Sequence, residues 1–84
     1  MNKTLHSAQH TKLCQLLQSI RHSQHLTQSE LAKKLDRPQS FVSKYEQGER
    51  RLDILELREV CLAVNLELQT FVTRLEDSIN GTKS

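Results

Sequence analysis

The chain has 84 residues, of which 36% are hydrophobic, two are glycine and one is proline, so it allows one small domain and is neither disordered nor rich in loops. Because helix formers dominate, we predict an all-α fold, which gains stability if the domain pairs with a second copy. Residues 1–51 carry nine Lys or Arg against four Asp or Glu (+5), and residues 52–84 carry three against six (−3), so we expect only the first part to approach a polyanion.

The sequence has no apolar run as long as a membrane span, and its N-terminus lacks the apolar core of a signal peptide. We therefore expect a cytoplasmic protein with no membrane partner. Two cysteines, Cys14 and Cys61, fall on apolar helical stripes, where a free thiol behaves as a small buried hydrophobe. A disulfide between them is not expected in a reducing cytosol.

The first amphipathic segment runs from about residue 8 to residue 24. Its apolar residues recur at helical spacing and predict one buried side. They are Leu13, Leu16, Leu17 and Ile20. Residues 1–7 show no strong pattern and are expected to form an N-terminal arm, with an early helical turn as the alternative. His25 follows where the chain must turn, at a position where glycine would be less strained.

Residues 27–48 predict two short helices joined by a tight turn. Thr27 and Glu30 have the spacing of a capping box at the start of the first helix. Its apolar stripe consists of Leu31, Ala32 and Leu35. Pro38 interrupts the periodicity, because proline disfavours helical geometry in the residue before it but is well placed just before a helix start.

The second helix of the pair is predicted from Gln39 to Gln47. Gly48 supplies the left-handed residue that ends it, and Val42 and Tyr45 form its buried side. Two helices this short bury too little apolar area to stand alone, so the first braces the second, which is displayed. The displayed amide, hydroxyl and ammonium groups suit base edges and phosphates and include no pairing typical of catalysis. They belong to Gln39, Ser40, Ser43, Lys44 and Gln47.

Two more helices are predicted in the acidic part of the chain. Asp53 and Glu56 repeat the capping-box spacing at the start of a helix that ends near Asn65, which tolerates a left-handed cap. A last helix is predicted over residues 67–79, and residues 81–84 are expected to form a disordered tail. The core stripe of the fourth helix is Ile54, Leu57, Val60, Cys61 and Val64, and that of the fifth includes Leu68 and Phe71.

This part of the chain has more apolar side chains than a single small core can cover. The excess residues form our candidate dimer interface, with residues 67–79 as the candidate dimerisation element. They are Leu55, Leu62, Val72, Leu75 and Ile79. For Leu62, packing against the N-terminal turns of the chain is an equal alternative.

The segment from about Leu13 to Phe71, most of the chain, resembles the DNA-binding domain of Cro and phage-repressor (XRE-like) helix-turn-helix regulators. The resemblance lies in L-T-Q-x-E-L-A at residues 26–32, in x-Q-S-x-V-S-K-Y-E-x-G at residues 38–48, and in a further capped helix at the expected distance. It implies a five-helix repressor-like domain over residues 8–80, with the helix-turn-helix at helices two and three, that binds double-stranded DNA.

A recognition helix in the major groove brings its N-terminal residues nearest the base edges, which selects Gln39, Ser40 and Lys44 as base readers. Gln39 suits a bidentate contact with adenine, Lys44 suits guanine, and Ser40 is permissive. Phe41 is included among the base readers with its orientation open. Its ring either lies against a thymine methyl or packs beside Tyr45, one turn away.

The candidate phosphate ligands flank this helix. Gln28 is first in its helix, where the amide and the helix N-terminus point outward, and the family uses a glutamine there for a phosphate. Arg37, in the turn, could reach a phosphate or a base. Ser43 and the loop residues Arg50 and Arg51 complete the set. Phosphate contacts position a domain without reading sequence.

The resemblance also implies an ion pair between Arg21 and Glu46. A glutamate beside Tyr45 at the end of an apolar helix is partly buried and needs a cationic partner. Two solvated surface charges are the alternative. The chain departs from the family pattern at Pro38, where a serine or threonine cap is usual, and at Asp36, where glycine is frequent. Both departures affect the expected tilt of the recognition helix.

His6, His10 and Cys14 are spaced four residues apart along one side of the first helix. Ligands on one straight helix rarely close a tetrahedral site, because successive turns lie about 6 Å apart. We therefore expect no metal, no cofactor and no small-molecule ligand. An enzyme is not expected either, since the chain has no phosphate-binding glycine loop and its histidines fall at surface or cap positions without acidic partners.

Two functions remain in competition. The first is a transcriptional repressor that binds an inverted-repeat operator as a homodimer, each subunit reading one half-site. The second is an antitoxin or adaptor that mainly binds a partner protein, such as a toxin, through its apolar C-terminal helix, with autoregulatory DNA binding. A neighbouring toxin gene or a co-purifying second chain would distinguish them.

Overall fold

The computed structural model describes residues 7–81, which form five helices and no strand. The helices are α1 (Ala8–Ser23), α2 (Gln28–Lys34), α3 (Gln39–Gln47), α4 (Ile54–Ala63) and α5 (Leu68–Asn80). The all-α prediction is therefore confirmed. The expected arm lies outside the described residues except for Ser7, and of the expected tail only Gly81 is described. No helix in this range is long and apolar enough to cross a membrane.

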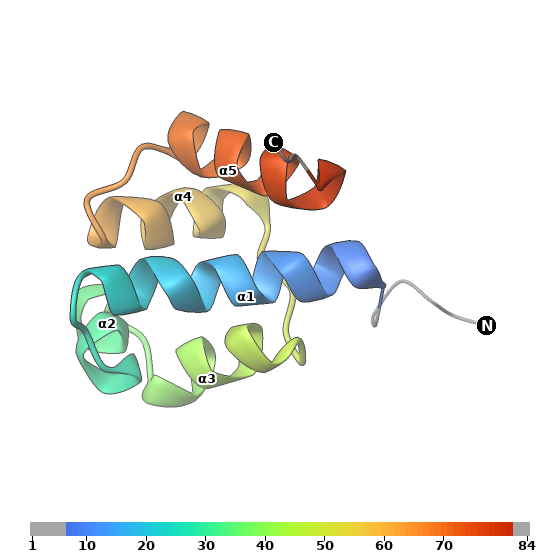
Figure 1. Ribbon diagram of the computed structural model, residues 1–84. Helices are drawn as coiled ribbons and strands as arrows, with labels where there is room; N and C mark the ends of the chain where they lie inside the picture. Colours follow the sequence, from blue (N-terminus) through green and yellow to red (C-terminus); the bar gives the residue numbers. More distant parts are fainter. Residues whose placement is uncertain (1–6, 82–84) are drawn as a thin grey trace.

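Helix α1 crosses the middle of the molecule, with α2 and α3 on one side and α4 and α5 on the other (Figure 1). All five helices contribute to one core. Its most buried large side chains are Leu17, Ile20, Leu31, Val42, Tyr45, Val60, Cys61 and Phe71. The acidic part of the sequence, which includes α4 and α5, thus lies across α1 from the helix-turn-helix pair.

Short polar side chains fix the starts of three helices. The Ser7 hydroxyl accepts a hydrogen bond from the His10 backbone N–H at 3.0 Å. Both predicted capping boxes are present: Thr27 and Glu30 exchange side chain–backbone bonds of 2.8 and 3.0 Å, and Asp53 and Glu56 exchange bonds of 2.8 and 3.0 Å. These bonds satisfy backbone donors that the helix itself leaves unpaired.

Left-handed residues make the turns between the helices. Gly48 ends α3 with φ +84°, as predicted. His25, Asp36 and Asn65 adopt φ values of 57°, 57° and 60° without being glycine. Asn and Asp tolerate this region better than most residues, whereas His25 adopts it although its side chain makes the conformation more costly.

Two sequence-based expectations about burial are wrong. Ile54 is 59% exposed and not part of the core, whereas Leu52 in the preceding loop packs against the core. His10 is 8% exposed and not at the surface, and its ring lies near Gly48 at the end of α3. Cys14 and Cys61 are buried and free, as predicted.

Candidate nucleic-acid interface

Helix α3 is anchored by its apolar residues and exposes its polar ones. Val42 and Tyr45 are at most 1% exposed, so this side of the helix is fully packed. Gln39, Ser40 and Lys44 are exposed, and Ser43 is half-buried. The three predicted base readers with polar side chains are therefore accessible at one helix.

A buried ion pair ties α3 to α1. Arg21 Nε and Nη2 donate to the two carboxylate oxygens of Glu46 at 2.7 and 3.0 Å, and Arg21 Nη1 donates to the Leu26 carbonyl oxygen at 2.9 Å. The two side chains are 8% and 3% exposed. Hydrogen bonding to Glu46 raises the pKa of Arg21, so its guanidinium stays charged. The predicted ion pair is thus present, and the alternative of two solvated charges does not hold.

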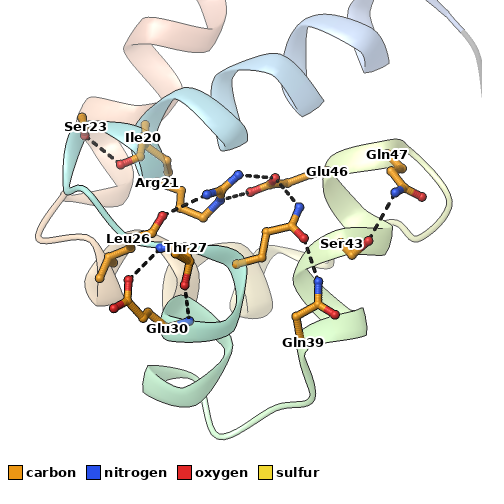
Figure 2. Close-up of polar contacts among 11 residues, drawn as sticks. Ile20, Arg21, Ser23, Leu26, Thr27, Glu30, Gln39, Ser43, Glu46 and Gln47 are labelled. Atoms are coloured by element: carbon orange, nitrogen blue, oxygen red, sulfur yellow. Dashed lines mark hydrogen bonds and ion pairs between the residues drawn. The ribbon is translucent and has the colours of Figure 1, made fainter.

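Two glutamines extend this ion pair to the start of α3. Gln28 Nε2 donates to Glu46 Oε1 at 3.0 Å, and Gln39 Nε2 donates to Gln28 Oε1 at 2.7 Å. Figure 2 shows the resulting chain of hydrogen bonds from Arg21 through Glu46 to Gln39. Nothing in the sequence pattern indicates the Gln28–Gln39 bond, although both residues are first in their helices. The bond orients the Gln39 amide and leaves its oxygen and one N–H available for other partners.

The inclusion of Phe41 among the base readers needs correction. Its side chain is 8% exposed and lies edge-on to Tyr45, with ring centroids 5.4 Å apart and an interplanar angle of 81°. Residues four apart share one side of a helix, and aromatic pairs favour this T-shaped arrangement. Of the two alternatives for Phe41, packing beside Tyr45 is the one observed.

Two predicted phosphate ligands, Arg37 and Arg50, lie over the Phe41 ring. Their Cζ atoms are 4.4 and 4.8 Å from the ring centroid. Arg50 donates to both carboxylate oxygens of Glu56 at 3.2 and 3.0 Å, and Arg37 approaches Glu56 and Glu59 at 3.8 and 3.9 Å. Each guanidinium therefore has acidic and aromatic partners within the chain, which no sequence pattern indicates.

The remaining phosphate candidates differ in their surroundings. The Ser43 hydroxyl accepts a hydrogen bond from Gln47 Nε2 at 3.3 Å. Arg51 is exposed in the loop before α4. Gln28 is half-buried and already donates to Glu46, which leaves one N–H of its amide for a phosphate.

The five candidate dimer residues fall into two groups. Leu55, Leu62 and Val72 are 68%, 53% and 39% exposed. Leu75 and Ile79 are half-buried and border a shallow hollow that Leu13 also lines. Only the first group offers apolar surface freely, and Leu62 is not packed away by the turns within residues 7–81.

The candidate metal ladder has no supporting geometry in the described residues. His6 lies outside them, and His10 Nε2 is 3.7 Å from Cys14 Sγ. No group of three or more potential metal ligands occurs within residues 7–81. Burial raises the pKa of the Cys14 thiol, and it raises that of Cys61 to about 11, so both thiols are protonated near neutral pH.

Comparison with known proteins identifies the family. A helix-turn-helix family model matches residues 17–71. An XRE-family like protein from Pseudomonas syringae pv. tomato shares 43% identity over 88% of this chain and 90% of its own, with a TM-score of 0.79. This chain belongs to the XRE-like helix-turn-helix family. It is therefore a DNA-binding regulator with α2 and α3 as its helix-turn-helix, as predicted.

Other solved structures share this fold. A point mutant of the restriction-modification controller protein C.Esp1396I is 25% identical, with a TM-score of 0.81 over 92% of this chain and 98% of its own. The clp gene regulator ClgR from Corynebacterium glutamicum is 22% identical, with a TM-score of 0.76 over 86% and 77% of the two chains. A search of curated protein sequences gave no match.

Proposed function

We propose that this XRE-like chain is a transcriptional repressor that binds an inverted-repeat operator as a homodimer. The observation that carries the proposal is the exposure of the polar side of α3, where Gln39, Ser40 and Lys44 are accessible. On the opposite side, Val42 and Tyr45 pack into the core and hold the helix in place. A helix held this firmly and exposed on its polar side suits insertion into the major groove. Occupying promoter DNA is the simplest route to repression.

The Gln28–Gln39 hydrogen bond supports the assignment of Gln39 to adenine. One N–H of Gln39 already bonds to Gln28 Oε1. The second N–H can then donate to N7 of adenine, and the amide oxygen can accept a hydrogen bond from the N6 amino group. Lys44 suits the O6 and N7 acceptors of guanine, and Ser40 bonds either kind of edge.

Phosphate contacts would hold the domain on the duplex. The free N–H of Gln28, the Ser43 hydroxyl and the Arg51 guanidinium are the proposed donors. Arg37 and Arg50 are partly engaged by the Glu56 carboxylate, which is 3.0 Å from Arg50 Nη2, and each keeps further N–H donors that a phosphate could accept. Such contacts set register and orientation and are independent of base sequence.

The apolar surface of α4 and α5 supports self-association. Leu55 and Leu62 are seven residues apart, which places them on the same side of α4, and Val72 is exposed on α5. The restriction-modification controller, which shares the fold at 24% identity, forms a tetramer in complex with its natural 35 base-pair operator. For this chain we propose a dimer whose two α3 helices enter half-sites roughly one duplex turn apart.

Selection of bound sequences from a random DNA pool tests this function. The expected result is an enriched inverted repeat, and a reporter placed behind that sequence should be repressed when the protein is expressed. Enrichment of a single, non-repeated site would contradict the homodimer. Failure to enrich any sequence would contradict sequence-specific binding.

The exposed leucines of α4 also favour a second candidate, an antitoxin or adaptor that binds a partner protein. Leu55 and Leu62 are more than half exposed, which is the kind of apolar surface a partner helix would cover. Co-expression with the product of a neighbouring gene, followed by affinity purification, tests this function. A stoichiometric complex that no longer binds DNA would favour it over the repressor.

A further inference from the structure

A cluster of four side chains joins the first turn of α3 to the first turn of α4, and we call it the Phe41 clamp. It consists of Arg37, Phe41, Arg50 and Glu56. Arg37 comes from the turn before α3 and Arg50 from the loop after it. The two guanidinium groups lie over the ring at 4.4 and 4.8 Å, within the range of cation–π attraction.

Helix α3 needs such a support because its start lacks a cap. Thr27 and Asp53 cap α2 and α4 with their side chains, whereas Pro38 precedes α3 without any side-chain cap hydrogen bond. A missing cap leaves the first turn of a helix less firmly held. That turn carries Gln39 and Ser40, the base readers whose geometry matters most.

Glu56 connects the clamp to the rest of the fold. Its carboxylate accepts two hydrogen bonds from Arg50 and one from the Asp53 backbone N–H, and Arg37 lies 3.8 Å away. The side chain is only 18% exposed, although it is charged. Hydrogen bonding from Arg50, and secondly from Asp53, holds the pKa of Glu56 below its usual value. Both guanidinium groups are therefore held from the capped start of α4.

We propose that Arg37, Phe41, Arg50 and Glu56 are positioning residues that set the orientation of α3 in the major groove and so determine how strictly Gln39 and Ser40 discriminate between bases. The inference rests on the proposed function as a sequence-specific DNA binder. In this role Arg50 acts through Phe41 and not as a phosphate ligand.

Loosening the clamp should reduce specificity more than affinity. A bidentate bond from Gln39 depends on the angle of α3, whereas contacts with phosphates are electrostatic and tolerate small rotations. A protein with a poorly oriented α3 therefore keeps its affinity for non-specific DNA. Its affinities for sites with the correct base and with a wrong base become more alike. The quantity to measure is the ratio of specific to non-specific binding constants.

Glu56→Gln distinguishes the clamp from a purely electrostatic effect, because only the clamp predicts a change in the specificity ratio. Removing a negative charge beside a DNA-binding surface should tighten binding to every sequence if charge alone matters. The clamp instead predicts a specificity ratio about tenfold lower, the loss of part of one bidentate contact. Glutamine still accepts the Asp53 N–H bond, so the capping box survives. Glu49→Gln, the same charge change beside Arg50 but outside the clamp, is the matched control and should keep the wild-type ratio.

Arg50→Lys tests whether Arg50 acts as a clamp residue or as a phosphate ligand. Lysine keeps the positive charge and can contact a phosphate, but it cannot bind Glu56 through a planar two-pronged group while it stacks on Phe41. The clamp predicts that the specificity ratio falls about as far as in Glu56→Gln, whereas a phosphate role predicts an unchanged ratio. Phe41→Leu, which keeps apolar volume but removes the ring face, should behave like Arg50→Lys.

The measurement is fluorescence anisotropy of each variant on the selected operator, on operators with single base changes and on random duplex DNA. Circular dichroism melting identifies any variant that does not fold. If Glu56→Gln does not fold, Arg50→Lys and Phe41→Leu test the clamp in its place. Wild-type protein that selects an operator, together with variants that keep its specificity ratio, would overturn the clamp alone. Wild-type protein that selects no operator would overturn the proposed function and the clamp with it.

Discussion

The guanidinium of Arg21 is paired by three hydrogen bonds, two with Glu46 and one with the Leu26 carbonyl. The Glu46 side chain is 3% exposed, and its carboxylate oxygens accept hydrogen bonds from this partner and from the Gln28 amide. Breaking a buried pair costs more than the pair contributes, since the remaining charge is left in a poorly solvated site. Single residues of this kind decide how rigidly α3 is held.

Replacing Arg21 with alanine should lower the free energy of unfolding by about 3–5 kcal/mol. For a domain of this size the midpoint of thermal unfolding should fall by 10 °C or more, on the order of 4–8 °C per kcal/mol. Thermal denaturation followed by circular dichroism measures the change. Arg74→Ala, at an exposed position on α5, is the control and should shift stability by less than about 0.5 kcal/mol. Equal midpoints for the two variants would contradict the role assigned to the ion pair.

A second prediction at the residue scale concerns Lys44, exposed on α3. Lys44→Ala should flatten the base preference at one operator position, with a loss of ~1–3 kcal/mol of discrimination there. Repeating the selection with the variant shows which position loses its preference. A uniform loss of affinity, with every preference retained, would make Lys44 a phosphate ligand and not a base reader.

At the level of helices, α2 and α4 begin with capping boxes while α3 begins at Pro38 without one. The start of α3 is instead held by the Gln28–Gln39 bond on one side and by the Phe41 clamp on the other. The helix proposed to read DNA is therefore oriented by its neighbours more than by its own cap. The acidic anchor of the clamp makes this arrangement sensitive to pH.

The pKa of Glu56 is lower in the folded chain than its ordinary value of 4.5. As the pH falls, the unfolded chain binds this proton first, so the stabilisation from Glu56 is complete above pH 4.5 and is lost as the pH drops through the folded-state pKa. Glu56→Gln has no such proton. The difference in unfolding free energy between wild type and Glu56→Gln, measured by urea denaturation, should shrink below about pH 4.5. A difference that stays constant down to about pH 3 would contradict the pairing.

For the whole molecule, charge and apolar surface are divided between the two sides of α1. The helix-turn-helix pair lies on one side, and the acidic helices α4 and α5 with their exposed leucines and valine lie on the other (Figure 1). A bound polyanion would thus meet mainly the basic part of the chain, while most of the acidic part faces away from it, except at the start of α4, where Glu56 contacts Arg50. The same division leaves Leu55, Leu62 and Val72 available to a second copy.

Disrupting that apolar surface should give a monomer. Leu55→Glu combined with Leu62→Glu places two charges on one side of α4, where each leucine is more than half exposed. Sedimentation velocity should show a fall from dimer to monomer, and operator binding should weaken. The variant should still melt as a folded, isolated subunit. Ser19→Glu, at an exposed position on α1, is the control and should remain dimeric. A wild-type protein that is itself monomeric at every concentration would contradict the proposed interface.

Local patterns in the sequence were sufficient to predict the five helices, both capping boxes and the left-handed Gly48. These features depend on residues three or four positions apart, whose geometry a helix fixes by itself. The Arg21–Glu46 pair was also predictable, because family resemblance and the need of a buried glutamate for a cation indicate the same partner. The exposure of Gln39, Ser40 and Lys44 followed from the spacing of Val42 and Tyr45.

Only the tertiary structure decided which polar side chains meet one another. Phe41 is buried because Arg37 and Arg50 converge on it from two loops, and Arg50 is held by Glu56 of another helix. His10 is buried where it meets Gly48, which is far along the chain. A guanidinium can bind a phosphate, a carboxylate or an aromatic ring, and composition does not choose among them. That choice depends on which groups the packed helices bring within reach.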